Sequence, residues 1–143
     1  MLVHCLYASR PAKPSPANLL DRILEQSRQN NPRRGITGLL CFTSDVFVQV
    51  IEGGRDEICE LFNTIVRDDR HTAVRLLSYG EIAERRFGGW TMGQVNLSAV
   101  NPALLLKYYE KAELNPFSAS GHATMALLME LVATGAIIAR AGA

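Results

Sequence analysis

Hydrophobic and polar positions change their period several times along the chain, and each period predicts a different element. Residues 2–9 (LVHCLYAS) alternate between two faces, as a short strand does. Residues 18–29 (NLLDRILEQSRQ) repeat their apolar side chains at helical spacing. Proline disfavours helical conformation in the residue before it, so Pro32 predicts that this helix ends near Asn30.

The hydrophobic patterns after the first helix predict four more strands and a second helix. They predict, in chain order, strands at 35–43 and 46–52, a helix at 55–68, and strands at 73–83 and 90–97. The resulting order, β-α-β-β-α-β-β, is that of an α+β, ferredoxin-like fold with one extra strand. Its first helix and its second helix are expected on one face of the sheet.

Two further helices are predicted beyond this unit, at 101–112 and 122–140. Their apolar side chains, which include Ile137 and Ile138, are too many to leave in water. We expect both helices to cover the other face of the sheet, with part of that surface left for self-association. The chain therefore divides into a domain at 1–97 and a helical extension at 98–143.

Composition narrows the classes of function. The chain has 143 residues and a formal net charge of +1, so it carries no basic excess for nucleic acid or an anionic membrane. No apolar stretch approaches the roughly 20 residues that a membrane span needs, and we expect a cytoplasmic protein. The three cysteines are widely spaced and predict neither a disulfide framework nor a metal site.

One polar residue interrupts the most apolar strand. Gln49 lies within VFVQVIEGG, and leaving a buried amide without partners costs on the order of 1–3 kcal/mol. It can pair with neighbouring backbone or a core hydroxyl, which would be a purely structural role. It can instead meet the phenol of Tyr7, because the ferredoxin-like order makes their two strands neighbours. Asn30 and Asn31 add amides at the end of the first helix, where they could also be a simple cap.

Four segments together resemble a known family. These are LYAS, ILEQSRQNNPRRGITGLLCFTSDVFVQVIEGG, IVRDDRH and RRFGGWTMG, within residues 1–97. They are similar to the BLUF family of flavin-dependent blue-light sensors. The resemblance implies a ferredoxin-like sheet with a non-covalently bound flavin between its two helices. FAD is the expected cofactor, and FMN or riboflavin can occupy such a domain because it holds mainly the isoalloxazine.

The resemblance also implies a role for the buried amide. Tyr7, hydrogen-bonded to Gln49, would pass an electron and a proton to the photoexcited ring. Gln49 would then be left rearranged, by rotation or tautomerisation, and would make a new hydrogen bond that shifts the absorption to the red. An uncharged side chain that is both donor and acceptor suits this role.

Other residues match the family pattern by position. The resemblance implies that the flavin contacts Ile23, Asn30, Asn31, Ile65, Asp68, Arg70 and His71. Without it, the two isoleucines would be core residues, and the three polar residues after them a solvated turn. Thr64 departs from the pattern, because an arginine often stands there, and either Arg67 or Arg70 could replace that contact.

Trp90 and Met92 stand two positions apart, so we expect them on the same face of the last strand. As bare residues they would be ordinary core. The resemblance implies that this pair takes part in signalling, and the sequence leaves open which of the two faces the flavin.

The function that follows is light sensing without catalysis. No motif for a nicotinamide, a P-loop or a metal is present, and we expect the output to be contact with a separate effector protein, with the chain as a dimer or larger oligomer. Two alternatives remain open: a flavin-dependent redox enzyme, and an adaptor without photochemistry. The presence of Tyr7, Asn31, Gln49 and Met92 argues against the adaptor.

Overall fold

A single mixed sheet lies at the centre of the computed structural model, which describes residues 1–12, 17–90 and 92–134. Its strands are β1 (Leu2–Pro11), β2 (Thr37–Phe42), β3 (Phe47–Gly54), β4 (His71–Ile82) and β5 (Gly93–Asn96). They lie in the order β4-β1-β3-β2-β5, and only β5 runs parallel to its neighbour β2. The first four strands have the ferredoxin-like arrangement, so the predicted fold class is confirmed.

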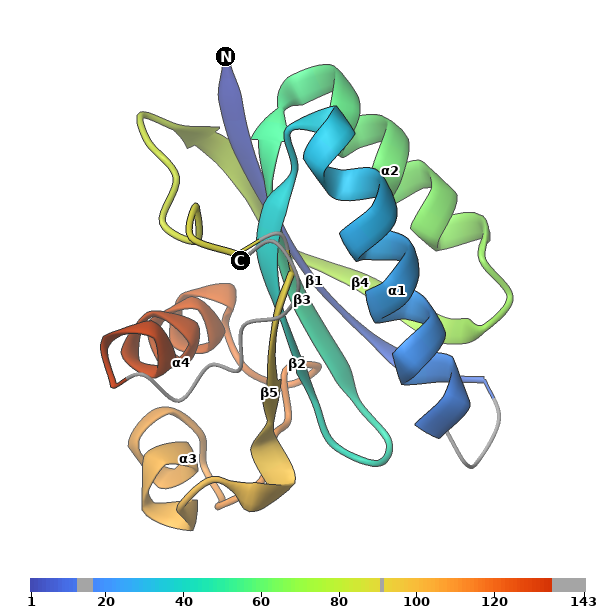
Figure 1. Ribbon diagram of the computed structural model, residues 1–143. Helices are drawn as coiled ribbons and strands as arrows, with labels where there is room; N and C mark the ends of the chain where they lie inside the picture. Colours follow the sequence, from blue (N-terminus) through green and yellow to red (C-terminus); the bar gives the residue numbers. More distant parts are fainter. Residues whose placement is uncertain (13–16, 91, 135–143) are drawn as a thin grey trace.

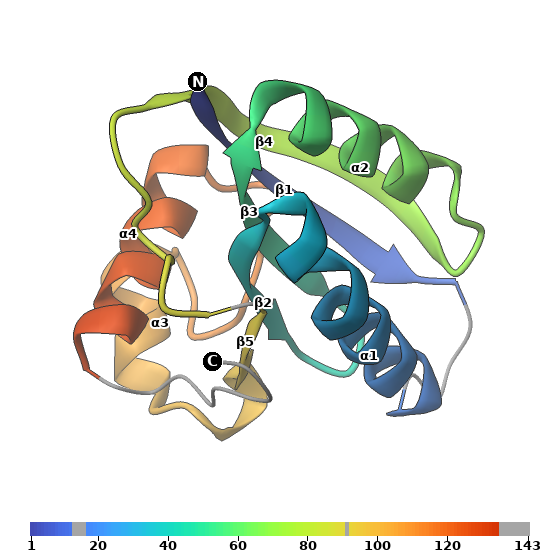
Figure 2. The same ribbon diagram turned by 45° about the horizontal axis from the view of Figure 1, so that its top comes forward.

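Helices cover both faces of this sheet. Helices α1 (Ala17–Arg34) and α2 (Arg55–Arg67) lie on one face, and α3 (Pro102–Tyr108) and α4 (Gly121–Ala133) lie on the other (Figures 1 and 2). A short 3₁₀ turn, Leu97–Ala99, leads from β5 towards α3. The three-layer arrangement explains why β2 and β3 are apolar on both faces.

Each layer boundary has its own core. The core under α1 and α2 contains the buried residues Val3, Cys5, Leu24, Ile36, Leu40, Phe47, Ile51, Ile58 and Met92. The opposite core contains Leu6, Leu39, Val48 and Val50 from the sheet together with Leu127, Leu128 and Leu131 from α4. Alternate residues of one strand therefore stabilise two separate cores, as the pleat requires.

Helix α1 continues past the predicted end. The expectation of a stop near Asn30 is wrong, because the helix runs through Pro32 to Arg34. Gly35 follows with φ +65°, and the N–H of Ile36 donates to the carbonyl of Asn31 at 2.9 Å while the N–H of Gly35 donates to Pro32 at 3.3 Å. This is a Schellman cap, and glycine is the residue that adopts its left-handed position without strain. Gly35, not Pro32, ends the helix.

The last strand and helix α3 are shorter than expected. Strand β5 begins at Gly93, not at residue 90, and neither Trp90 nor Met92 belongs to a strand. Helix α3 ends at Tyr108, since Tyr109 turns into the core and its hydroxyl lies 2.8 Å from that of Thr124 in α4. Helix α4 extends to Ala133, and the predicted residues 135–140, with Ile137 and Ile138, lie outside the described part of the chain.

Helix α4 contacts the sheet through its first residue. The Cα of Gly121 approaches β4 so closely that a Cβ there would overlap the carbonyl oxygen of Leu77. Ser120 caps the helix by accepting a hydrogen bond from the N–H of Ala123 at 3.1 Å. The start of α4 is therefore fixed directly against the edge strand β4.

Candidate functional site

Two buried polar side chains meet on the face of the sheet that α1 and α2 cover. Tyr7 of β1 and Gln49 of β3 are directly opposite partners in the antiparallel register, and both are buried. The Tyr7 hydroxyl donates to Oε1 of Gln49. The Gln49 Nε2–H donates in turn to Sδ of Met92 at 3.3 Å. These contacts form a linear series in which the amide is both acceptor and donor.

The phenol in this series stays protonated. Burial raises the pKa of Tyr7 well above its ordinary value, and the nearby Cys5 and Asp68 raise it further. The ring of Phe62 meets the Tyr7 ring edge-on, with centroids 5.7 Å apart. Tyr7 is therefore a neutral hydrogen-bond donor held in one orientation by packing.

A cavity of about 180 Å³ opens above this pair, between α1 and α2. Its apolar walls are Ile23 of α1 and Leu61 and Ile65 of α2, which face one another across it. Its polar lining is Tyr7, Gln26, Ser27, Asn30, Asn31, Arg34, Gln49, Thr64, Asp68, Arg70 and His71. The cavity thus combines apolar walls with amide, hydroxyl and charged groups around its edge.

Asp68, Arg70 and His71 form the rim where α2 passes into β4. The Arg70 guanidinium donates to Asp68 through Nε at 3.0 Å and through Nη2 at 2.6 Å, and these bonds hold the pKa of the Asp68 carboxyl below its ordinary value. Nη2 of Arg70 also donates to Oε1 of Gln26 in α1 at 3.0 Å. Arg70 therefore joins the turn after α2 to α1 across the cavity.

His71 is buried at the inner end of this rim. Its Nδ1 lies 3.0 Å from the hydroxyl of Ser9, and its Nε2 lies 3.8 Å from Oδ2 of Asp68. Burial lowers the pKa of His71, the Asp68 carboxylate opposes this, and the Arg70 cation adds to it. The structure therefore favours the neutral imidazole.

We expect His71 to make the protein less stable in mild acid. In the folded protein the pKa of His71 lies below its ordinary value of 6.5. Its contribution to the free energy of unfolding is therefore complete above pH 6.5. That contribution is lost as the pH falls below 6.5, because the unfolded state then binds a proton that the folded state does not. Urea unfolding from about pH 8 to about pH 5 measures this slope. His71→Asn should flatten it.

His4 is half-buried, and partial burial together with the Arg86 cation also lowers its pKa, so some slope should remain in the His71→Asn variant. His122 is exposed in α4, and His122→Asn is the matched control that should leave the slope unchanged. An unchanged slope in His71→Asn would contradict the assignment.

The structure gathers the residues selected from the sequence. Tyr7, Ile23, Asn30, Asn31, Gln49, Ile65, Asp68, Arg70 and His71 all line this one cavity. Thr64 lines it as well, and its hydroxyl donates to the backbone carbonyl of Glu60 at 3.0 Å. Of the two arginines that could replace an arginine at Thr64, Arg70 lines the cavity and Arg67 does not.

The expectation that Trp90 and Met92 share a face is wrong. Both residues precede β5 and belong to no strand, so the alternation of a strand does not apply to them. Met92 is buried in the core under α1 and α2, where it contacts Gln49. Trp90 packs against the opposite core, beside the extension helices. Met92 is therefore the member of the pair that faces the cavity side of the sheet.

Several lining residues were not selected from the sequence. They are Gln26, Ser27, Arg34 and Leu61. Ser27 follows Ile23 by four positions and precedes Asn31 by four, so the helical period could have identified it. Arg34 follows Asn30 by four positions, so the same period applies to it, and in the structure it also makes an ion pair with Glu57 at 2.5 Å.

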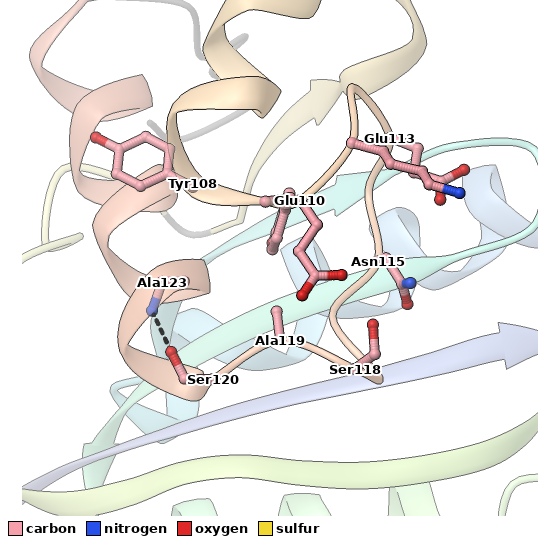
Figure 3. A pocket seen from close by; sticks show the side chains of 10 residues that line it. Tyr108, Glu110, Glu113, Asn115, Ser118, Ala119, Ser120 and Ala123 are labelled. Carbon is pink, nitrogen blue, oxygen red and sulfur yellow. Dashed lines mark hydrogen bonds between the residues drawn. The ribbon is translucent and has the colours of Figure 1, made fainter.

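A second cavity lies in the extension, away from this site. It has a volume of about 370 Å³ and is lined by residues between Tyr108 and Ala123. Figure 3 shows the side chains of Glu110, Asn115 and Ser118 around it. Of its lining residues only Tyr109 is buried, so within the described residues it holds no counterpart of the buried Tyr7–Gln49 pair.

Comparison with known proteins identifies the family. The model of the family "BLUF: Sensors of blue-light using FAD" matches residues 2–93, which include every side chain named around the Tyr7 cavity. The chain belongs to the BLUF family. FAD is the cofactor that defines this family.

Solved BLUF structures have the same fold over almost the whole chain. The dark-state structure of the BLUF protein BlrB is 33% identical, with a TM-score of 0.78, over 94% of this chain and 96% of that one. The photo-activated state of BlsA is 29% identical, with a TM-score of 0.80, over 92% and 95% of the two chains. Both likenesses extend beyond residue 93 and so include extension helices.

A curated relative is much longer. The photoactivated adenylate cyclase subunit beta of Euglena longa is 29% identical over 111 residues, which are 75% of this chain and 13% of that subunit. The BLUF unit therefore occurs both as most of a short chain and as a small part of a light-regulated enzyme.

The cavity has the groups that a flavin ring requires. Ile23 and Ile65 can contact the two faces of a flat ring, and the amides of Asn31 and Gln49 offer both donors and acceptors to its polar edge. Asn30 also lines the cavity, and its Oδ1 accepts from Nη2 of Arg33 at 2.9 Å.

Within the described residues, no helix is long and apolar enough to cross a membrane.

Proposed function

We propose that this BLUF protein senses blue light through a hydrogen-bond switch at Gln49, over a flavin held between α1 and α2, and relays it to a separate effector protein. One observation carries the proposal. Tyr7, Gln49 and Met92 form a continuous buried series, of which Tyr7 and Gln49 line the cavity, and the amide in its middle can take two orientations. FAD, when bound, supplies the absorption of blue light and a ring that can accept an electron and a proton.

The protein's own residues define the resting orientation. Tyr7 has a proton to donate, so Oε1 of Gln49 faces it. The thioether of Met92 has no proton and can only accept a hydrogen bond, so the Nε2 side of the Gln49 amide faces Sδ. Both contacts select the same amide orientation. Turning Gln49 by half a revolution would place its Oε1 against the Met92 sulfur, where neither atom has a hydrogen to share.

This asymmetry gives the switch a direction. Once light has reversed the amide, the unfavourable contact of its oxygen with Met92 favours return to the resting orientation. Tyr7, neutral and fixed by Phe62, remains ready to donate again. The switch therefore resets in darkness without any further energy source.

Absorption spectra before and after a blue flash, with recovery followed in darkness, test the proposal. Flavin bands that shift to the red and return in darkness would support it. A protein that takes up no flavin would favour an adaptor without photochemistry. A yellow protein that only bleaches, and that turns over a nicotinamide or oxygen in the dark, would favour a redox enzyme.

The extension at 98–143 is proposed as the output region. Within its described part, Leu127, Leu128 and Leu131 of α4 are buried against the sheet, and Gly121 lies on the backbone of β4. Trp90 packs into the same core. A change that begins at Gln49 and Met92 can therefore reach α4 through the sheet edge and the loop before β5.

Hydrogen exchange in darkness and under continuous blue light measures this relay. We expect amides of α4 to exchange faster in light, because their packing on the sheet weakens, while amides of α2 outside the cavity serve as the internal control. If only peptides that line the cavity change, the extension does not carry the signal.

A further inference from the structure

The loop that carries Trp90 and Met92 is attached to the sheet through a buried carboxylate. Glu52 of β3 is 1% exposed and lies on the face of the sheet opposite Gln49, as the alternation of the strand dictates. Its Oε2 accepts from the N–H of Arg86 and its Oε1 from the N–H of Phe87, both at 2.8 Å. Among the buried polar side chains of the described residues, Glu52 is the one with a carboxyl group.

The loop is also held at two further points. Nη1 of Arg85 donates to the hydroxyl of Thr37 at 3.0 Å and to the backbone carbonyl of Glu52 at 3.2 Å. The carbonyl of Trp90 accepts from the N–H of Gly38 at 3.2 Å. Arg85 and Trp90 are thereby fixed to β2 and β3, and Trp90 stands two positions before Met92.

Glu52 reaches Met92 through these bonds. Phe87, which Glu52 holds, accepts through its carbonyl from the N–H of Trp90 at 3.2 Å. Phe87 and Trp90 pack in the core beside α4, whereas Met92 has crossed to the other core and contacts Gln49. The carboxylate therefore determines where the loop crosses between the two cores.

We propose that Glu52 is a positioning residue for the light switch, which holds the sulfur of Met92 against Gln49 by binding the backbone of Arg86 and Phe87. A carboxylate suits this role because each of its oxygens accepts one N–H with no hydrogen of its own to interfere. The inference rests on the proposed function, because it concerns the same Gln49 switch. Glu52 would then help to determine how long the reversed orientation of Gln49 lasts in darkness.

Glu52→Gln tests this directly. The glutamine can accept from one of the two backbone N–H groups, but its own amide hydrogens face the other, so the loop loosens and Met92 moves away from Gln49. The contact that disfavours the reversed amide weakens, and we expect dark recovery to slow by about threefold. Glu81→Gln, at an exposed ion pair with Arg55, is the matched control that should leave recovery unchanged.

A double-mutant cycle separates positioning from general stability. If Glu52 acts through Met92, then Glu52→Gln should not alter the recovery rate in a Met92→Leu protein. An equal slowing in both backgrounds would overturn the proposal. If Glu52→Gln fails to fold, Arg85→Met is the second variant, because it removes only two hydrogen bonds of a half-exposed side chain. Like Glu52→Gln, it should slow dark recovery.

Methyl NMR gives a readout that does not depend on photochemistry. In Glu52→Gln the Met92 methyl resonance should shift or broaden, with and without flavin, while that of Met129 in α4 should stay in place. An unmoved Met92 resonance would exclude the positioning role even if the photocycle is present. If the Met92 resonance shifts but the protein shows no reversible red shift, the positioning of Met92 by Glu52 would be supported and the proposed light-sensing function would be contradicted.

Discussion

Replacing Gln49 with leucine is expected to abolish the reversible red shift while the protein still binds flavin. Leucine has nearly the volume of glutamine and suits the apolar core around this position, so the cavity walls on α1 and α2 should remain. It has neither donor nor acceptor, so no second hydrogen-bonded arrangement exists. Tyr7 also loses its acceptor, which should reduce stability by about 1–3 kcal/mol.

The light-minus-dark difference spectrum measures this loss. Gln26→Leu is a suitable control, because Gln26 lines the same cavity but bonds to Arg70 and not to Tyr7. We expect that control to retain the shift. A normal shift in Gln49→Leu would mean that another group makes the switch.

The largest expected loss of stability follows from Gly38→Ala. Gly38 of β2 lies opposite Ile51 of β3, and a Cβ on it would overlap the carbonyl oxygen of Val50 and lie 3.2 Å from the carbonyl carbon. Backbone in the middle of a sheet cannot move aside as a flexible side chain can. We expect the free energy of unfolding to fall by about 3 kcal/mol and the Tm by roughly 10 °C.

Gly54→Ala provides the comparison within the same sheet. Gly54 ends β3, and a Cβ built there has no neighbour within 4 Å. Its φ of −63° suits any residue, but Gly54 is the N-cap of α2 and alanine is a poorer N-cap than glycine, so we expect a loss of at most about 1 kcal/mol. Thermal unfolding of the two variants side by side measures the difference. Equal stabilities would show that the β2–β3 contact at Gly38 relaxes freely.

The order of elements could be predicted from the sequence because each has a clear period. The strands around Tyr7 and Gln49 alternate or are wholly apolar, and helix α2 has a regular apolar face. The neighbouring strands also predicted that Tyr7 and Gln49 can meet on one face, but the register that puts them directly opposite each other comes from the structure, because strands apolar on both faces do not specify it. The family resemblance then selected rim residues such as Asp68 and His71, which periodicity alone describes only as a turn.

Other features depend on contacts that no local pattern contains. The end of α1 was misplaced because Pro32 is a stronger local signal than the Schellman cap at Gly35, which needs the buried Ile36 to complete it. Trp90 and Met92 were placed on one face because the loop before β5 reads as a strand. Its true path is set by Glu52, a residue 34 positions before Arg86.

The register of β1 and β3 has a consequence for how such a switch can be built or transferred. Tyr7 and Gln49 are separated by 42 positions in the chain, yet they face each other simply because they are cross-strand partners. The entropy of bringing them together is lost when the sheet folds, not when the sensor operates. A protein engineer could therefore seek the same reactive pair in any buried antiparallel ladder, and would need to graft two side chains, not a loop.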